Sequence, residues 1–150
     1  MLDTGTEAPD FELPDHHGRT RRLSDTDGRV VLYFYPRADT PGCTTQACGF
    51  RDNWDAYEAH GITVFGISDD PVSDLEAFAD KFDLPIALLS DEDGAVAKRY
   101  DSYGEKKMFG NTFDGVFRNT YVVSDGVIEA VYEGVDPDGH AEAILKDIEG

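Results

Sequence analysis

The chain has 150 residues and carries 13 Lys and Arg against 31 Asp and Glu, which gives a formal net charge of -18. This length suits one domain with its own hydrophobic core, so residues 1–150 are expected to form a single domain. Nucleic acids and anionic membrane surfaces would repel so acidic a chain, and both are excluded as expected partners.

The first fifteen residues, "MLDTGTEAPDFELPD", have no basic start and no apolar stretch typical of a signal peptide, and no apolar run reaches the length of a membrane span. The sequence therefore favours a cytoplasmic protein. A thiol there is more often catalytic, redox-sensing or metal-binding than part of a structural disulfide. The acids are scattered between apolar segments, which argues against a disordered acidic tail and suggests adaptation to high salt, where screening relieves self-repulsion.

The predicted elements begin with "DFELPDHHGRTRRLSD", residues 10–25, which is expected to form a small N-terminal β-hairpin. The run "VVLYFYP", residues 30–36, is continuously apolar and ends at a proline, as expected for a strand covered on both faces. A helix is predicted over roughly residues 42–60.

Further strands are predicted in "ITVFGIS" from Ile62 and "PIALLS" from Pro85, with helices at residues 72–82 and about 94–100. Two β-rich runs then flank Asp125-Gly126, a strong hairpin signal, before a closing helix over about 137–148. Parallel βαβ units followed by a hairpin and a helix indicate an α/β, thioredoxin-like fold with a central mixed sheet flanked by helices.

The two cysteines lie at the start of the helix predicted after residue 40. Thr40 and Pro41 form a helix-start signal, with Thr40 as N-cap, so Cys43 is expected in the first turn. Free backbone N–H groups and the helix dipole favour a thiolate there, and such positions lower a cysteine pKa.

Cys43 belongs to an apolar stripe that is expected to face the core, whereas Cys48 points to another side of the helix. The stripe consists of Cys43, Ala47, Phe50, Trp54 and Tyr57. Five residues along an ideal helix separate two Cα atoms by about 8.7 Å, and a disulfide needs less than about 7 Å. The two thiols therefore either never pair or pair only after local unwinding.

The segment "YPRADTPGCTTQACGFRD" resembles the active-site segment of the peroxiredoxins, with their pattern Pro-x-x-x-Thr-x-x-Cys at Pro36, Thr40 and Cys43. A second cysteine five residues on, and the stretch "YGEKKMFGNTFDGVFRNTYVVSDG", are similar to the subgroup called bacterioferritin comigratory protein or peroxiredoxin Q. One departure is Gln46, where this family more often has Glu.

The resemblance implies an antioxidant thiol peroxidase that reduces hydrogen peroxide and alkyl hydroperoxides without a metal or other cofactor. It implies that Cys43 becomes a sulfenic acid, that Cys48 resolves it as an intramolecular disulfide, and that a thioredoxin or glutaredoxin-like reductant reopens the bond. It also assigns Arg118, Thr40 and Pro36 to the active site and favours a monomer.

Other interpretations remain open. Thr40 could be only an N-cap, Arg118 only a surface cation, and Cys48 an inert helix residue. The whole chain could be a redox-sensing or holdase-like interaction protein without efficient turnover, whereas a thioredoxin-class disulfide exchanger would need a Cys-x-x-Cys motif. Four further features are expected to be structural. His16 and His17 are expected in a solvated turn, and His60 and His140 at the surface. Lys106 and Lys107 are expected to form a charge patch, with docking of the reductant as an alternative. The glycines expected in loops are Gly104, Gly110 and Gly115.

Overall fold

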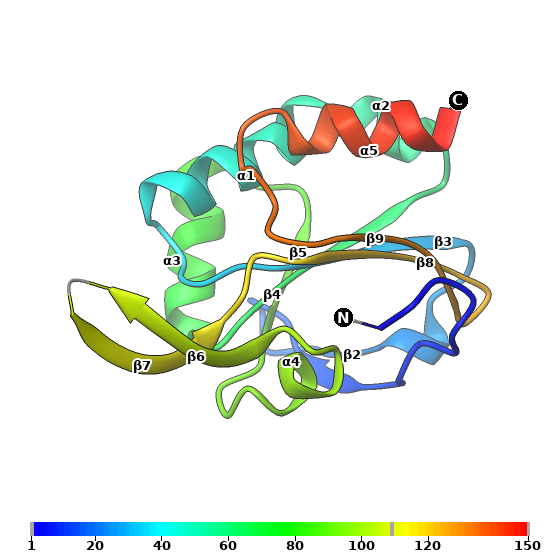
Figure 1. Ribbon diagram of the computed structural model, residues 1–150. Coiled ribbons are helices and arrows are strands. Elements are labelled where there is room, and N and C mark those ends of the chain that lie inside the picture. Colours follow the sequence, from blue (N-terminus) through cyan, green and yellow to red (C-terminus); the bar gives the residue numbers. More distant parts are fainter. Residues whose placement is uncertain (1, 109, 150) are drawn as a thin grey trace.

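The computed structural model describes residues 2–108 and 110–149, and its centre is a five-stranded mixed sheet in the order β5-β4-β3-β8-β9 (Figure 1). β3, β4 and β5 run parallel, while β8 is antiparallel to both β3 and β9. The strands are β3 (Arg29–Phe34), β4 (Thr63–Ser68), β5 (Ala87–Ser90), β8 (Thr120–Ser124) and β9 (Val127–Tyr132). This sheet confirms the predicted fold class.

β3 lies in the middle of the sheet and is buried on both faces, as its unbroken apolar run predicts. Val31 and Tyr33 enter one hydrophobic cluster, whereas Leu32 and Phe34 enter the other. At Gly66 of β4, the strand next to β3, an added Cβ would lie 2.6 Å from the Tyr33 ring, so only glycine fits beside this tyrosine.

The helices divide between the two faces of the sheet. The first cluster takes side chains from α1 (Pro41–Asp52), α2 (Trp54–Ala59), α3 (Val72–Phe82) and α5 (His140–Glu149). The second takes α4 (Ala95–Arg99) and the N-terminal segment. Figure 1 shows α1, α2 and α5 above the sheet and α4 below it. Among the described residues, none of these helices is long and apolar enough to cross a membrane.

The predicted N-terminal hairpin is confirmed. β1 (Glu12–Pro14) pairs antiparallel with β2 (Thr20–Arg22), and the short helix η1 (Leu23–Asp25) follows. The turn between the strands was expected to be solvated, and this is wrong for His16. Its side chain is buried, and its Nδ1 accepts a hydrogen bond from the Leu88 N–H at 3.3 Å.

Two helix boundaries differ from the prediction. One helix over residues 42–60 was expected, but α1 and α2 meet at Asn53, whose side-chain amide donates to the Gly49 carbonyl at 2.8 Å and competes with the helical pattern. The last helix begins at His140 rather than at 137. Before it, Asp138 N–H donates to the Asp136 carboxylate, and Gly139 has a φ of 74° in the left-handed region.

A second hairpin was missed from the sequence. β6 (Tyr103–Met108) and β7 (Asn111–Val116) pair antiparallel, with Gly104 opposite Gly115. The expectation of loop glycines is therefore wrong for these two, and holds only for Gly110, which lies in the turn with a φ of 79°. Glycines inside strands weaken the usual strand pattern, which explains why this hairpin escaped prediction.

Candidate active site

The thiol of Cys43 lies at the start of α1, three residues into the helix, and only 2% of the residue is exposed. Thr40 occupies the N-cap position and Pro41 the first helical position, as predicted. The Thr40 hydroxyl does not cap the helix, however, because it donates to the Arg37 carbonyl at 2.9 Å. The first-turn N–H groups are thus left without this side-chain acceptor, close to the Cys43 residue.

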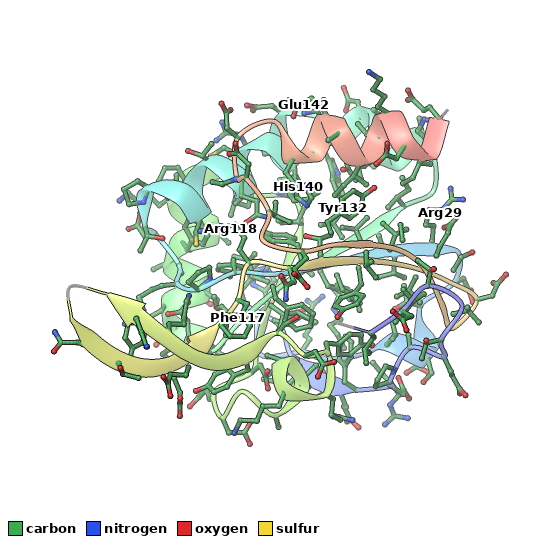
Figure 2. The ribbon with its side chains drawn as sticks, viewed as in Figure 1. Arg29, Phe117, Arg118, Tyr132, His140 and Glu142 are labelled. Atoms are coloured by element: carbon green, nitrogen blue, oxygen red, sulfur yellow. The ribbon has the colours of Figure 1, made fainter. Side chains whose placement is uncertain are left out.

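Arg118 reaches this sulfur from the segment between β7 and β8. Its Nη2 donates to Cys43 Sγ at 3.3 Å, and its Nη1 donates to Gln46 Oε1 at 2.7 Å. Figure 2 places Arg118 between α1 and the sheet. Gly42 allows the approach, since an added Cβ there would lie 3.2 Å from Arg118 Nη2. The structure thus joins two residues that the sequence separates by 75 positions.

The partner that orients Arg118 is a neutral amide. Gln46 is 1% exposed, and its Nε2 has no hydrogen-bond partner among the described residues. A carboxylate at this position would neutralise the guanidinium, whereas the amide of Gln46 leaves the positive charge directed at the sulfur. The departure from the family pattern therefore lies in direct contact with the site.

The loop before α1 is fixed by a residue that the sequence analysis did not select. Asp70, just after β4, accepts hydrogen bonds from the Ala38 N–H at 2.7 Å and from the Ser68 hydroxyl at 2.8 Å. This buried carboxylate ties the loop that carries Pro36 and Thr40 to the end of the sheet. The only sequence signal was an acidic pair directly after a buried strand.

An open pocket is lined by Arg118, the residue that contacts the Cys43 sulfur. Its volume is ≈ 580 Å³, and its lining residues are Pro36, Asp101, Lys106, Phe117, Arg118, Asn119, Glu133 and Gly134. A pocket of this size accepts a small organic molecule. The predicted site residues Pro36 and Arg118 are therefore walls of one cavity, and Arg118 connects that cavity to the buried thiol.

Cys48 lies in the same unbroken helix as Cys43 and is partly exposed, and both cysteines are free thiols. The structure thus has the reduced, fully wound arrangement in which an ideal helix keeps the two Cα atoms about 8.7 Å apart. The expected stripe is also present, because Cys43, Ala47, Phe50 and Tyr57 are buried and Trp54 packs against them.

The sequence suggested that His140 lies at the surface, but the structure shows that it is buried. It is 6% exposed at the start of α5, and its Nε2 lies 2.9 Å from Thr120 Oγ1 (Figure 2). Burial, together with the charge of Arg118, lowers the pKa of His140 to about 4.

His60 is a surface residue and pairs with Glu149 at 3.0 Å. Among the described residues, no group of His, Cys, Asp and Glu is arranged to hold a metal ion.

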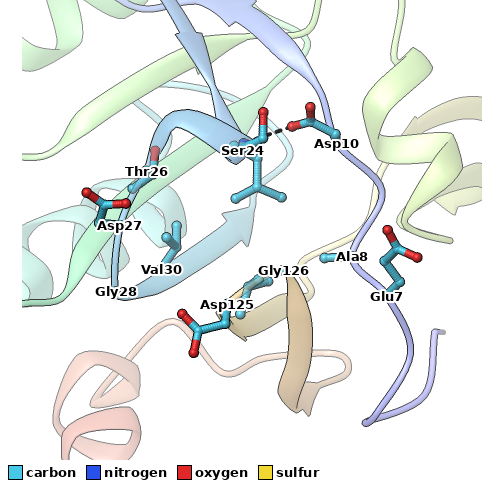
Figure 3. A pocket seen from close by; sticks show the side chains of 12 residues that line it. Glu7, Ala8, Asp10, Ser24, Thr26, Asp27, Gly28, Val30, Asp125 and Gly126 are labelled. Carbon is cyan, nitrogen blue, oxygen red and sulfur yellow. Dashed lines mark hydrogen bonds between the residues drawn. The ribbon is translucent and has the colours of Figure 1, made fainter.

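A second cavity contrasts with the active-site pocket (Figure 3). It lies between the N-terminal segment and the turn after β8, and it has a volume of ≈ 340 Å³. Four carboxylates line it, from Glu7, Asp10, Asp27 and Asp125, and none of its twelve lining residues carries a thiol or a cation. It has no group that could attack or polarise a peroxide.

A buried thiol at a helix N-terminus, touched by a guanidinium and next to an open pocket, defines a thiol-based redox enzyme on a thioredoxin-like fold. The profile of the AhpC/TSA family matches residues 4–131, and the chain belongs to this family. Peroxiredoxin Bcp of Escherichia coli is 44% identical over 146 residues, which cover 96% of this chain and 94% of that protein.

Solved structures agree with this assignment. The crystal structure of Peroxidoxin BcpB from Mycobacterium tuberculosis superposes with a TM-score of 0.88 at 38% identity, covering 99% of this chain and 97% of that one. Bacterioferritin comigratory protein of Xanthomonas campestris, described for its alkyl peroxide reduction activity, gives a TM-score of 0.89 at 30% identity, with coverage of 99% and 96%. The peroxiredoxin resemblance and the thioredoxin-like fold are thus confirmed.

Proposed function

We propose that this peroxiredoxin reduces hydrogen peroxide and alkyl hydroperoxides with Cys43 as the attacking thiolate. The observation that carries the proposal is the 3.3 Å contact between Arg118 Nη2 and Cys43 Sγ beside an open pocket. The alkyl peroxide reduction named for the Xanthomonas relative supports the same substrate class.

In the first step, the sulfur of Cys43 attacks the terminal oxygen of the hydroperoxide. An S–O bond forms and the O–O bond breaks, which leaves a sulfenic acid and an alcohol or water. An unperturbed thiol is about 3% ionised at pH 7, so complete ionisation gains at most roughly thirtyfold in rate. The larger contribution must come from donors aimed at the breaking bond, and Arg118, which contacts the sulfur, and the Cys43 backbone N–H in the first turn of α1 are the proposed donors.

Thr40 and Pro36 shape the entrance to this step. Pro36 lines the pocket and helps to exclude water, which strengthens the electrostatic interactions there. The Thr40 hydroxyl bonds to a carbonyl of its own loop in the reduced protein, and rotation would free it to donate to a bound peroxide.

In the second step, Cys48 attacks the sulfenic sulfur, releases water and forms the intramolecular disulfide. This step requires the turns of α1 between the two cysteines to unwind, which breaks the Arg118 contacts with Cys43 and Gln46. A thioredoxin or glutaredoxin-like dithiol then reduces the disulfide by exchange.

The remaining parts of the proposal concern the setting of the enzyme. The family resemblance favours a monomer, and the net charge of -18 argues against nucleic-acid or membrane partners and for a cytoplasm rich in salt.

Turnover with a thioredoxin, its reductase and hydrogen peroxide tests the cycle. Cys43→Ser should abolish turnover, and Cys48→Ser should consume about one equivalent of peroxide and then stop with this reductant. Normal cycling of Cys48→Ser would show that Cys48 does not resolve the sulfenic acid. A rate constant no higher than that of free cysteine would instead favour the alternative of a redox-sensing or holdase-like protein.

A further inference from the structure

Lys106 is a cation of the active-site pocket that the cycle above does not use. In β6 it lies opposite Phe113 in the strand register, but its side chain runs along β7, and its Nζ donates to the Val116 carbonyl at 2.8 Å. Gly115 leaves room for this path, because an added Cβ there would make a tight contact of 3.2 Å with Lys106 Cδ.

Gly104, which pairs with Gly115 across the two strands, leaves room for an aromatic ring in the same way. An added Cβ at Gly104 would lie 3.1 Å from the ring of Phe117, which Figure 2 labels below Arg118, near the base of the hairpin. The two paired glycines thus seat Lys106 and Phe117, and both line the pocket of Arg118. Hairpin β6–β7 and the residue that follows it thus bring a cation and an aromatic ring to the pocket that Arg118 lines.

The ammonium of Lys106 has protons to give. One of its three protons is engaged by Val116, and within the described parts of the chain no carboxylate lies within salt-bridge distance of Nζ. Burial, and then the charge of Arg118, lower the pKa of Lys106 below the usual 10.5.

The first chemical step needs such a donor. Cleavage of the O–O bond places an electron pair on the leaving oxygen, and hydroxide and alkoxide are strong bases that leave poorly without a proton. An arginine stabilises this charge but does not give up its proton in proteins. Arg118 also has both of its described hydrogen bonds on the helix side of the pocket, to Cys43 and Gln46.

Resting on the proposed peroxidase function, we propose that Lys106 is a further catalytic residue, the general acid that protonates the leaving oxygen. The Cys43 thiolate forms the S–O bond, the O–O pair moves to the leaving oxygen, and that oxygen takes a proton from the Lys106 ammonium. The products are the sulfenic acid, an alcohol or water, and a neutral amine that regains its proton from solvent.

The test compares leaving groups at pH 7 by stopped-flow measurement of the first oxidation step. Lys106→Met should slow reaction with hydrogen peroxide and tert-butyl hydroperoxide by about 100-fold, the lower end of general-acid contributions. Peracetic acid releases acetate, a weak base that needs no proton, so its rate should fall less than about threefold. Lys107→Met removes the same charge from the neighbouring exposed position and should leave all three rates unchanged.

Two further measurements separate proton donation from charge and from structure. Lys106→Arg keeps the charge but not the transferable proton, and should remain slow with hydrogen peroxide and normal with peracetic acid. In the wild type, the hydrogen peroxide rate should fall as pH rises through the pKa of Lys106, below 10.5, and this limb should be missing in Lys106→Met.

An equal loss with all three oxidants, no loss, or full recovery in Lys106→Arg would overturn the general-acid role while leaving the peroxidase function intact. A wild type that fails to consume hydrogen peroxide would instead reject the proposed function, and the inference with it.

Discussion

The two ends of α1 are held in different ways. At the N-terminal end, the side-chain hydrogen bonds of Cys43 and Gln46 go to one guanidinium, that of Arg118. At the other end, Asn53 donates to both Gly49 and Glu142, and Arg51 donates to the Phe82 carbonyl at 2.7 Å.

The difference shows which part of the helix can respond to oxidation. In the proposed cycle Arg118 holds the sulfur most strongly when Cys43 is the attacking thiolate, because a hydrogen bond to an ionised group is roughly twice as strong as a neutral one. Conversion of Cys43 to a sulfenic acid removes that charge and weakens the N-terminal anchor. The contacts at the other end do not involve sulfur, so the helix should melt from one end only.

The largest expected effect on the rate of oxidation separates two arginines, one at each end of α1. Arg118→Ala removes the donor aimed at the sulfur and should slow the first oxidation step by about 10²–10³-fold, as for other donors of this kind. Arg51→Ala removes the hydrogen bond to the Phe82 carbonyl and the exposed ion pair with Asp52, and should cost about 1 kcal/mol of unfolding free energy with the rate unchanged. Stopped-flow kinetics and urea unfolding measure the two effects, and equal rates in both variants would remove Arg118 from the site.

The next largest effect concerns the pH dependence of stability and involves α5, the helix that packs against α1. His140 has a folded pKa of about 4 against a usual 6.5, because burial opposes its charge. As pH falls below 6.5, the unfolded chain takes up a proton that the folded protein refuses, so stability should fall between pH 6.5 and 4, by at most about 3 kcal/mol from this group.

His140→Gln should flatten that part of the stability–pH curve, whereas His60→Gln at the exposed pair with Glu149 serves as the control. Urea unfolding at pH 7, 5.5 and 4 would measure the curves. Parallel curves for the wild type and His140→Gln would contradict the assignment.

A smaller effect should appear when the C-terminal anchor itself is loosened. Asn53→Ala removes the amide that holds Gly49 and Glu142, so the free energy of unfolding should fall by about 1 kcal/mol. The rate of disulfide formation should stay unchanged, because only the turns between Cys43 and Cys48 have to open. Glu142→Gln keeps an acceptor for the amide and should lower the stability less. Urea unfolding measures the stability and the fluorescence of Trp54, the single tryptophan, reports the rate; faster closure in Asn53→Ala would show that the C-terminal end opens as well.

Salt should raise the stability of the whole acidic protein and should not act on one end of α1 in particular. Because screening shortens to about 3 Å at 1 M salt, the melting temperature should climb as KCl rises into the molar range. A flat or falling curve would reject adaptation to high salt.

The sequence predicted the parts of the molecule that follow from local patterns. The continuous apolar run gave β3, and Thr40-Pro41 gave the start of α1 with Cys43 in its first turn. Arg118 came from a resemblance, because nothing local shows that a residue 75 positions away will reach the sulfur.

The missed features depend on long-range packing. Asp70 is an ordinary acid in the sequence, and becomes an anchor only because the end of β4 lies beside the loop before α1. His140 follows a glycine in a polar stretch that resembles surface, but the packing of α5 on the sheet buries it. The roles of Gly104 and Gly115 depend on the side chains that cross them, which a sequence does not display.

Hydrogen exchange of the reduced and the peroxide-treated protein, followed by mass spectrometry, tests most directly whether α1 opens only between its two cysteines. We expect a disulfide between Cys43 and Cys48, with protection lost in the turns of α1 between them and retained in α2 and β3. An oxidised protein with the same disulfide and an equally protected α1, or with loss of protection spread through α2, would contradict it.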